Sequence, residues 1–227
     1  MNTQAANLRK AMQQDVVMCP GAWNGLVGAA IAKTGFQACY ISGGATANAS
    51  GYPDVGLITL TEMCRTIKEV SNASKLPVIV DADTGYGELE CLARTISEYE
   101  RNGAAGMHIE DQEFPKRCGH LDGKILISQS SMEQKIRVAS ENRISKEFIL
   151  IARTDARGVD GLDVAISRGN AYREAGADMI FPEGLRSEDE FEEFAKQCPG
   201  LLLANMTEFG KTPHIPAQRF GELGYNL

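Results

Sequence analysis

A cysteine flanked by cationic side chains stands in the stretch KRCGH, residues 116–120. Lys116 and His120 each lie two residues from Cys118, and cations beside a thiol favour the thiolate and hold an anionic substrate next to it. Gly119 lets the backbone approach a ligand closely. The surrounding proline, glycine and mixed charge indicate a loop. We interpret Cys118 as a candidate for proton transfer, with Lys116 and His120 as its catalytic neighbours; an inert thiol is the alternative.

Paired carboxylates follow an apolar run in the stretch DADTGYG. Asp81 and Asp83 are two residues apart, so they share one face at the end of a strand. Carboxylates suit Mg²⁺, which takes few protein ligands and leaves positions for substrate oxygens. Glu110, at the end of another apolar run, would complete such a site. The alternative is that these acids cap a helix or form ion pairs in a loop.

Two further places could hold a substrate carboxylate. Ser-Gly-Gly at residues 42–44 offers unobstructed backbone N–H groups after a strand, although a tight turn is the alternative. Arg153 ends an apolar run, where an unpaired charge is costly, so it requires an anion. That anion is either Glu183, in a structural ion pair, or the substrate. His108, inside an apolar run, is expected to be a hydrogen-bonded core residue rather than a ligand.

The elements that must position these residues are apolar runs that alternate with helix-like amphipathic segments. Seven runs are predicted as strands: residues 16–19, 38–44, 77–83, 106–111, 148–155, 179–184 and 201–208. Capping boxes are predicted at Thr59/Glu62, Ser130/Glu133 and Ser187/Glu190, and helix ends at Gly35, Gly103 and Gly176. Residues 43–58 and 112–128 are predicted as long loops that close over a site.

Near-continuous apolar strands separated by helices predict a parallel sheet, either a (β/α) barrel or an open doubly wound sheet. Polar groups follow nearly every strand, the last of them Asn205, Thr207 and Glu208, which favours a barrel whose site is built from all the βα loops. A dinucleotide-binding sheet would show GxGxxG after its first strand, and none is present. We predict an α/β fold, a (β/α)8 TIM-type barrel in which residues 1–227 form one domain lacking the last βα unit and C-terminal helices.

Composition narrows the class of protein. The 227 residues, 43% of them hydrophobic, suffice for one core, and a net charge of -7 argues against binding to nucleic acid or to an anionic membrane. Six cysteines without a CxxC pair predict reduced thiols. The N-terminal residues lack the apolar core of a signal peptide, and no segment is long enough to span a membrane. We expect a cytoplasmic protein with a small-molecule substrate.

Taken together, the motifs resemble those of the isocitrate lyase and phosphoenolpyruvate mutase superfamily, and within it those of the 2-methylisocitrate lyases. They are PGAWNG, YISGG, YPDVG, VDADTGYG, GMHIEDQ, KRCGH, ARTDA, FPEG and LANMTEFG, and they span essentially the whole chain. The resemblance implies a Mg²⁺-dependent or Mn²⁺-dependent lyase that cleaves 2-methylisocitrate to pyruvate and succinate in the methylcitrate cycle of propionate catabolism. It also implies a homo-oligomer, in the family a tetramer with exchanged C-terminal helices, which this chain lacks.

The resemblance further implies roles for individual residues. Cys118 matches the residue that protonates the succinate enolate, and Tyr40 matches the general base. The positions implied to hold the metal are Asp81, Asp83, Asp54 and Glu110. The positions implied to contact the tricarboxylate or dicarboxylate substrate are Ser42, Gly43, Gly44, Gly119, Arg153, Glu183, Asn205 and Thr207.

Three alternatives stay open. A sister lyase acting on isocitrate, 2,3-dimethylmalate or another C2-substituted malate would use the same metal and thiol. A phosphonate mutase or an oxaloacetate decarboxylase lacks the cysteine motif, so Cys118 argues against that branch. A catalytically incompetent fragment or anion-binding paralogue would keep the anion pocket without turnover.

Overall fold

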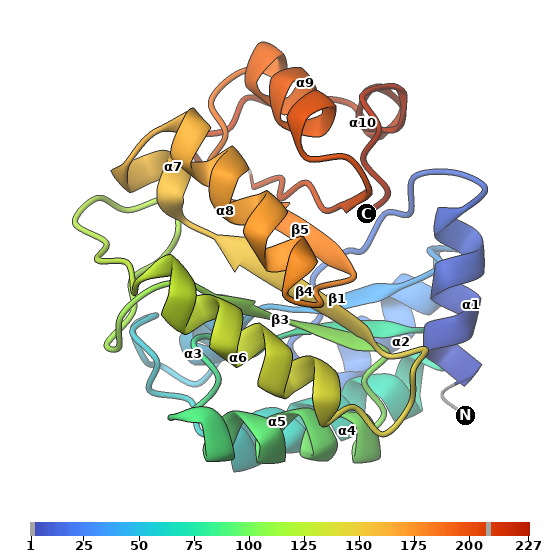
Figure 1. Ribbon diagram of the computed structural model, residues 1–227. Coiled ribbons are helices and arrows are strands. Elements are labelled where there is room, and N and C mark those ends of the chain that lie inside the picture. Colours follow the sequence, from blue (N-terminus) through green and yellow to red (C-terminus); the bar gives the residue numbers. More distant parts are fainter. Residues whose placement is uncertain (1–2, 208–209) are drawn as a thin grey trace.

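Six parallel strands form one sheet whose spatial order follows the sequence (Figure 1). The computed structural model describes residues 3–207 and 210–227. The strands are β1 (Cys39–Ile41), β2 (Val78–Asp81), β3 (Gly106–Glu110), β4 (Ile149–Thr154), β5 (Met179–Pro182) and β6 (Leu201–Leu202). Each strand pairs in parallel with the next, as the alternation of apolar runs and helices predicts.

Helices surround the outer face of this sheet (Figure 1). The helix α2 (Gly25–Lys33) precedes β1, and those between strands are α3 (Gly43–Ala49), α4 (Leu60–Ser74), α5 (Leu89–Arg101), α6 (Gln129–Glu141), α7 (Ala156–Val159), α8 (Leu162–Glu174) and α9 (Glu188–Gln197). The helices α1 (Thr3–Met12) and α10 (Ala217–Glu222) lie near the two ends of the chain. None of the helices in the described ranges is both long and apolar enough to cross a membrane.

Side chains alternate between the two faces of each strand and build two cores. Ile79, Ile151 and Phe181 point inward, and Leu8 and Met12 of α1 complete this inner cluster. The residues between them on the strands point outward and pack against the covering helices. Because α1 contributes to the inner cluster, it covers the end of the barrel opposite the polar strand ends.

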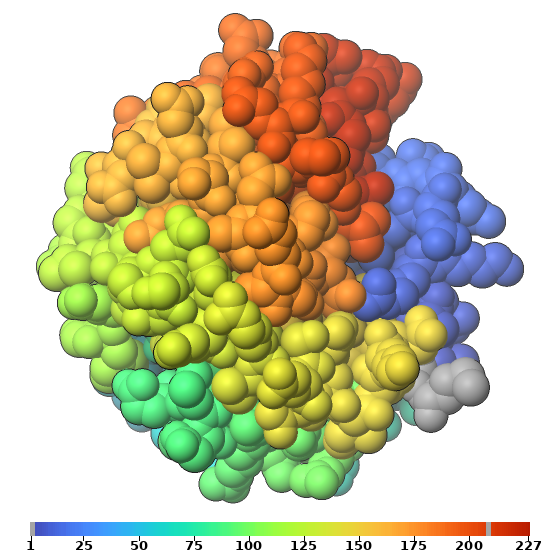
Figure 2. Space-filling view, viewed as in Figure 1, coloured from blue at the N-terminus to red at the C-terminus, as the bar shows by residue number. Residues whose placement is uncertain are grey.

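Backbone hydrogen bonds between the two ends of the chain close the sheet into a ring. Ala22 N–H donates to the carbonyl of Tyr40 at 2.7 Å, so the N-terminal segment lies beside β1. On its other side, Asn226 N–H donates to Leu202 O and Val17 N–H donates to Asn226 O, each at 2.9 Å. The N-terminal and C-terminal segments accordingly lie side by side at one edge of the molecule (Figure 2). The predicted barrel architecture is confirmed, with residues 225–227 between β6 and the N-terminal segment.

One predicted strand is wrong. Residues 16–19 form no ladder, and pairing with β1 is limited to an isolated bridge between Gly21 and Tyr40. Pro20 accepts a hydrogen bond from Tyr40 N–H but has no N–H with which to continue the ladder. The segment therefore contributes to the barrel wall as an irregular stretch.

The predicted helix starts are correct at two places and wrong at one. Thr59 and Glu62 form a reciprocal capping box at α4. At α9, the hydroxyl of Ser187 caps the helix, although the carboxylate of Glu190 binds elsewhere. At α6 the cap is Ser128, whose hydroxyl accepts the Ser131 N–H, and not the predicted pair Ser130/Glu133. Serines at 128, 130 and 131 make the position of the N-cap ambiguous in the sequence.

The three glycines predicted to end helices have positive φ just beyond helix ends, as expected: Gly35, Gly103 and Gly176.

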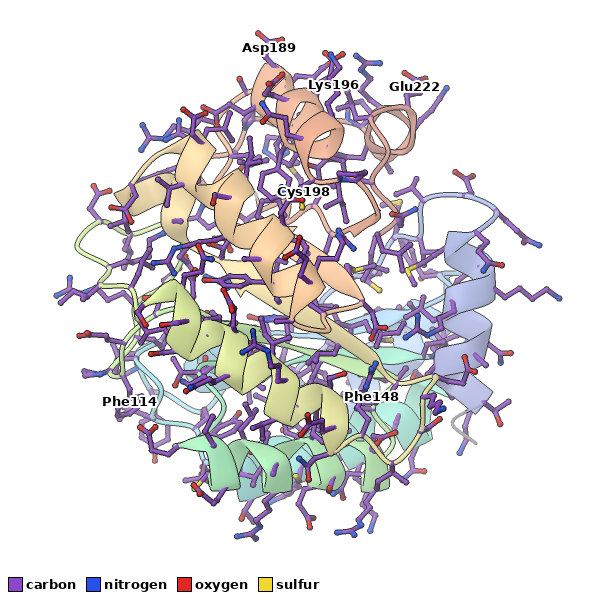
Figure 3. The ribbon with its side chains drawn as sticks, in the orientation of Figure 1. Phe114, Phe148, Asp189, Lys196, Cys198 and Glu222 are labelled. Carbon is purple, nitrogen blue, oxygen red and sulfur yellow. The ribbon has the colours of Figure 1, made fainter. Side chains whose placement is uncertain are left out.

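The two predicted long loops lie against each other. The first is partly helical, because α3 occupies its beginning, so residues 43–49 are a correction to the prediction. The second, 112–128, is tied at its base by the bridge between Gln112 and Leu126. A Cβ at Gly56 would lie 2.6 Å from the ring of Phe114, which the second loop carries at the periphery of the molecule (Figure 3). The loops therefore form one rim of the barrel mouth.

Candidate active site

A cavity of about 800 Å³ opens at the carboxyl ends of the strands. Asp81 ends β2, Arg153 lies near the end of β4, and Glu183 directly follows β5. Thirteen of the sixteen predicted site residues line this cavity: Tyr40, Ser42, Gly44, Asp54, Asp81, Lys116, Cys118, Gly119, His120, Arg153, Glu183, Asn205 and Thr207. The other three, Gly43, Asp83 and Glu110, lie behind its wall. Glu208, predicted at the same rim, is outside the described residues.

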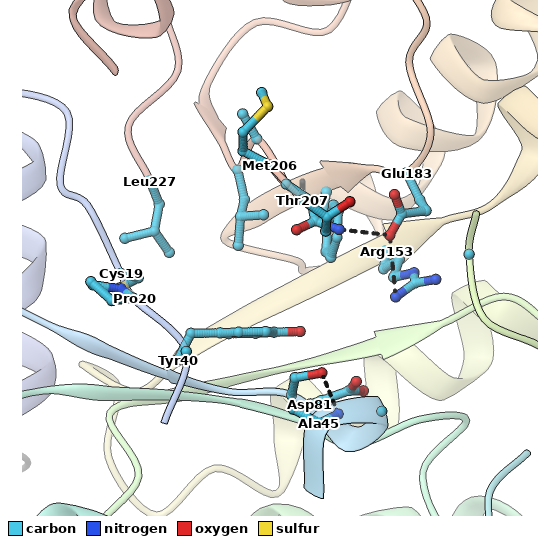
Figure 4. Close-up of a pocket in the computed structure, with 18 of the residues that line it drawn as sticks. Cys19, Pro20, Tyr40, Ala45, Asp81, Arg153, Glu183, Met206, Thr207 and Leu227 are labelled. Atoms are coloured by element: carbon cyan, nitrogen blue, oxygen red, sulfur yellow. Dashed lines mark hydrogen bonds and ion pairs between the residues drawn. The ribbon is translucent and has the colours of Figure 1, made fainter. Parts of the chain in front are cut away.

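The cavity has a charged side and an apolar side (Figure 4). Arg153 and Glu183 lie on one side, and Cys19 and Leu227 lie on the other. The ring of Tyr40 extends between the two, with its hydroxyl toward the charged side. Such a division suits a small molecule that is polar at one end and carries an apolar substituent at the other.

The Ser-Gly-Gly stretch positions carboxylates. Ser42 caps α3, and Gly43 N–H donates to Asp81 Oδ2 at 3.0 Å. The other oxygen of Asp81 accepts the Asp83 N–H at 2.9 Å. A Cβ on Gly44 would lie 2.9 Å from Asp54 Oδ2, so a larger residue would collide with that carboxylate. The N–H of Gly43 is therefore already committed to Asp81 and does not face the cavity.

Lys116 lies at the cavity wall and pairs with these acids. Its ammonium pairs with Asp54, and it lies 2.9 Å from Asp83 Oδ1. Burial alone would lower the pKa of Lys116, but the surrounding carboxylates, Asp81 and Glu110 foremost, raise it above its ordinary value. Lys116 is therefore a charged internal counterion of the acid cluster.

Negative charge exceeds positive charge in this part of the site. Among the described residues it contains six carboxylates and three cationic side chains: Asp54, Asp81, Asp83, Glu110, Asp155 and Glu183, with Lys116, Lys124 and Arg153. Burial, followed by the charge of Asp81, raises the pKa of Asp83 to about 6. Burial likewise raises the pKa of Glu110 well above its ordinary value, although Arg153 opposes it. The site therefore favours additional positive charge.

The acids fit a divalent cation in composition. Both carboxylate oxygens of Glu110 are buried without a hydrogen-bond partner. Burial opposes ionisation of Asp81, but His108, Lys116 and Arg153 outweigh it and lower the pKa of Asp81 to about 2. In the part of the chain that the structure describes, no three acidic, histidine or cysteine side chains converge as a ready metal site. Lys116 instead lies between Asp54 and Asp83.

Arg153 is held by three carboxylates. Its Nε donates to Asp155 Oδ2 at 2.9 Å and lies 3.4 Å from Glu110 Oε2, and its Nη1 lies 3.4 Å from Glu183 Oε2. Asn205 Nδ2 donates to the same Glu183 oxygen at 3.2 Å. The ion pair with Glu183 that the sequence left as an alternative is therefore present. Because Arg153 also lines the cavity, a substrate carboxylate can still reach it.

The cysteine loop packs directly onto this arginine. Cys118 is partly exposed at the cavity wall, and Leu121 N–H donates to its carbonyl at 2.9 Å. His120 Nε2 lies 3.5 Å from Glu183 Oε1. A Cβ on Gly119 would lie 2.3 Å from Arg153 Nη2. Only glycine therefore allows the loop to approach the arginine this closely.

We expect Gly119→Ala to lower turnover and raise KM, because its methyl group forces the loop away from Arg153 and Glu183. A displacement of about 1 Å at such a site can reduce the rate by about 10²-fold. Steady-state kinetics of the purified variant would measure both constants. Gly21→Ala is the matched control, because it lies on the same cavity and a Cβ there meets nothing within 4 Å. Equal kinetics for the two variants would contradict the close approach.

Tyr40 is hydrogen bonded to a buried histidine. Tyr40 Oη lies 2.8 Å from His108 Nε2, and His108 Nδ1 lies 3.7 Å from Asp81 Oδ1. Burial, with the charge of Asp81, raises the pKa of Tyr40 well above its ordinary value, so Tyr40 is a neutral phenol. His108 is fully buried and hydrogen bonded, so its prediction as a core residue is confirmed.

The buried histidine makes stability depend on pH. Burial lowers the pKa of His108 from 6.5 to about 4, although Asp81 opposes this. Between these two values the unfolded chain binds a proton that the folded chain excludes, so stability falls as the pH falls through this window. The expected loss from His108 alone is about 2 kcal/mol between pH 7 and pH 5. Urea unfolding at both pH values, on the parent and on His108→Gln, would measure it; an equally steep pH dependence in the variant would contradict the assignment.

Sequence reasoning missed two buried ionic groups and the apolar wall. Lys124 and the carboxylate of Asp155 form an ion pair of 3.0 Å below the cysteine loop. A lysine in a loop of mixed charge gives no local signal of burial, and Asp155 is only the last residue of the predicted strand 148–155. On the apolar wall, Cys19 ends the run wrongly predicted as a strand, and Pro20 follows it. The position of Cys19 and Pro20 beside the cavity could have been inferred from the barrel topology.

The fold and the site together define a barrel enzyme whose cavity lies between buried acids, an arginine and a cysteine loop. The sequence profile described as phosphoenolpyruvate phosphomutase matches residues 8–227. The chain belongs to the phosphoenolpyruvate mutase and isocitrate lyase family.

Individual relatives indicate which members of this family the chain resembles strongly in sequence and in structure. The chain is 49% identical over 215 residues to a protein of Aeropyrum pernix named 2-methylisocitrate lyase, a match that covers 95% of this chain and 69% of that protein. Relatives of the same name, which denotes a carbon–carbon lyase, match at 42% to 49% identity. A crystal structure of 2,3-dimethylmalate lyase superposes with a TM-score of 0.95 at 39% identity, covering 100% of this chain and 77% of that one.

A more distant structure carries ligands. Phosphonopyruvate hydrolase in complex with oxalate and Mg²⁺ superposes with a TM-score of 0.79 at 28% identity, covering 88% of this chain and 71% of that chain. That protein therefore binds a small dicarboxylate together with a divalent metal on the same fold.

Proposed function

We propose that this protein is a carbon–carbon lyase that cleaves 2-methylisocitrate to pyruvate and succinate. The observation that carries the proposal is the placement of Tyr40 and Cys118 on one cavity, with Arg153 between the acid cluster and the cysteine loop. Cleavage requires a base at one end of the breaking bond, a proton donor at the other and cations for the carboxylates. The identity to relatives named for this reaction supports the choice of substrate.

The reaction begins at the hydroxyl group of the substrate. Tyr40 accepts the hydroxyl proton and passes its own proton to His108 Nε2, 2.8 Å away. Burial lowers the pKa of His108 and so keeps it neutral beforehand, while the nearby carboxylate of Asp81 favours the protonated form that this transfer creates. The O–H electron pair becomes the carbonyl of pyruvate, and the electrons of the breaking C–C bond move to the carbon next to a succinate carboxylate. Cys118 donates its proton to that carbon. The proton held by His108 returns through Tyr40 to the cavity, where it reaches the thiolate, so the cycle balances.

Arg153 and Gly119 bind and orient the substrate. The guanidinium of Arg153 neutralises a carboxylate, and Gly119 brings the loop close enough to shield the reacting carbon from water. Asp81, Asp83, Asp54 and Glu110 would hold the metal, which we propose is Mg²⁺, with Mn²⁺ as a substitute. When bound, the metal acidifies the substrate hydroxyl and neutralises the adjacent carboxylate. Lys116 would then give up its place between Asp54 and Asp83.

The remaining expectations from the sequence belong to the same proposal. We propose a cytoplasmic enzyme of propionate catabolism whose single barrel domain comprises residues 1–227, acting as a homo-oligomer. Ser42, Gly44, Asn205 and Thr207 line the cavity and are proposed to contact the substrate. Gly43 is proposed to act indirectly, through Asp81.

A second candidate is a sister lyase for 2,3-dimethylmalate. The structural match to 2,3-dimethylmalate lyase favours it, and so does the apolar side of the cavity. Both substrates carry a methyl group on the hydroxyl-bearing carbon, and they differ in the substituent on the neighbouring carbon, which is carboxymethyl in 2-methylisocitrate and methyl in 2,3-dimethylmalate, so the two require direct comparison.

The test is a product assay with purified protein and Mg²⁺, offered 2-methylisocitrate, isocitrate and 2,3-dimethylmalate separately. Pyruvate and succinate from 2-methylisocitrate, lost on addition of EDTA, are the expected result. Propionate from 2,3-dimethylmalate at a higher kcat/KM would replace the first candidate by the second. Absence of product from all three would reject both.

A further inference from the structure

Lys124 is a buried cation that has no role in the proposed reaction. Its side chain is only 3% exposed, and it does not line the cavity. Its Nζ donates to the carbonyl of Gly119 and lies 3.0 Å from Asp155 Oδ1. A buried ammonium is retained only where its partners compensate for lost hydration, so these two contacts define where it acts.

Asp155 binds two cations at once. Arg153 Nε donates to its Oδ2 at 2.9 Å and Arg153 Nη2 to its Oδ1 at 3.2 Å, while Lys124 approaches the same Oδ1. Burial would raise the pKa of Asp155, but Arg153 and Lys124 lower it below its ordinary value. One buried carboxylate therefore joins the arginine of the cavity wall to the lysine of the cysteine loop.

The contact with Gly119 fixes the loop at the residue next to the reactive thiol. Gly119 lies between Cys118 and His120 and packs directly on Arg153 and Glu183. Lys124, five residues along the same loop and not itself part of the cavity lining, holds the carbonyl of this glycine. The turn that carries Cys118 is thus held against Arg153 by the hydrogen bond from Lys124 to the Gly119 carbonyl. Lys124 is in turn fixed by Asp155, which follows the last residue of β4.

We propose that Lys124 and Asp155 form a latch that positions Cys118 over the cavity by holding the Gly119 carbonyl. Lys124 is a positioning residue, because it touches neither the cavity nor the thiol. The proposal rests on the proposed function for the role of Cys118, but the position of the thiol can be measured without turnover.

The kinetic test uses Lys124→Met and Asp155→Asn. We expect Lys124→Met to lower kcat by about 10²-fold, as a misplacement of about 1 Å does, with a smaller change in KM because Arg153 keeps Glu183 as a partner. The double variant should be no slower than the slower single variant, since both changes release the same latch. Lys211→Met is the matched control: it removes another lysine ion pair of this loop, with Asp122, at the exposed surface.

The second readout is the rate at which iodoacetamide alkylates Cys118, mapped by mass spectrometry, with the exposed Cys91 as an internal standard. Relative to Cys91, we expect Cys118 to react several times faster in Lys124→Met and in Asp155→Asn than in the parent or in Lys211→Met. Should Lys124→Met fail to fold by circular dichroism, Asp155→Asn, which preserves side-chain shape, decides the result.

The possible outcomes test the latch and the proposed lyase activity separately. Parental kcat together with a parental labelling ratio in Asp155→Asn and Lys124→Met would overturn the latch. Faster labelling in both variants, in a protein that cleaves none of the three substrates, would support the latch and reject the proposed function. Lower kcat with unchanged labelling would show a structural effect on Arg153 and would also overturn the latch.

Discussion

Cys118→Ser should retain the fold and lose most of the turnover. The hydroxyl of serine is a much weaker acid than a thiol, so the succinate carbanion would not be protonated at a useful rate. General acid catalysis of this kind contributes about 10²- to 10⁴-fold, and we expect a loss of kcat in that range. KM should change little, because the carboxylate contacts of Arg153 are untouched. Stopped assays of pyruvate formation, with circular dichroism on the same samples, would measure both effects.

The control for this substitution is Cys91→Ser, which changes an exposed cysteine outside the cavity. It should leave kcat at the parental value. Near-parental turnover in Cys118→Ser would remove the thiol from the mechanism and leave the loop with a purely shielding role.

Asp81→Ala should abolish metal-dependent turnover. Burial raises the pKa of Asp83 and of Glu110, whereas neighbouring cations lower that of Asp81, so Asp81 is the proposed metal ligand that is ionised most readily at neutral pH. Loss of a metal forfeits several kcal/mol of transition-state stabilisation, so we expect a decrease of about 10³-fold or more. Isothermal titration calorimetry with MgCl₂ should show binding in the parent and none in the variant.

Asp122→Ala is the control for that result, because Asp122 is an aspartate at the surface, with 87% of its side chain exposed. It should bind Mg²⁺ as the parent does. Asp81 also accepts the N–H groups of Gly43 and Asp83, so thermal unfolding of Asp81→Ala must accompany the titration. A folded variant that still binds Mg²⁺ would place the metal elsewhere in the site.

The order of the strands and the gathering of polar residues at their ends could be predicted, because both follow from periodicity. Val78 to Asp81, for example, is apolar until its last residue, and in a parallel barrel all such last residues meet at one mouth. The helix α3 was missed, because its residues Gly43–Ala49 are small and follow a turn-like Ser-Gly-Gly stretch.

Pairings between distant residues could not be predicted in the same way. Lys116 was expected to serve Cys118, two residues away, yet its ammonium lies with Asp54 and Asp83. Lys124 likewise forms an ion pair with Asp155, which is distant from it in the sequence. A long flexible side chain on a loop can reach several partners, and the choice among them depends on where the strands bring the carboxylates.

The closure of the ring has a kinetic consequence. The join between Val17, Asn226 and Leu202 connects the two extremes of the chain by a few main-chain bonds, so it has the greatest loop-closure entropy of any contact in the sheet. Such contacts form late in folding and are the first to separate when the native state fluctuates. The barrel therefore opens most readily along this line, beside the apolar half of the cavity, while the strands that carry the acids and Arg153 stay paired.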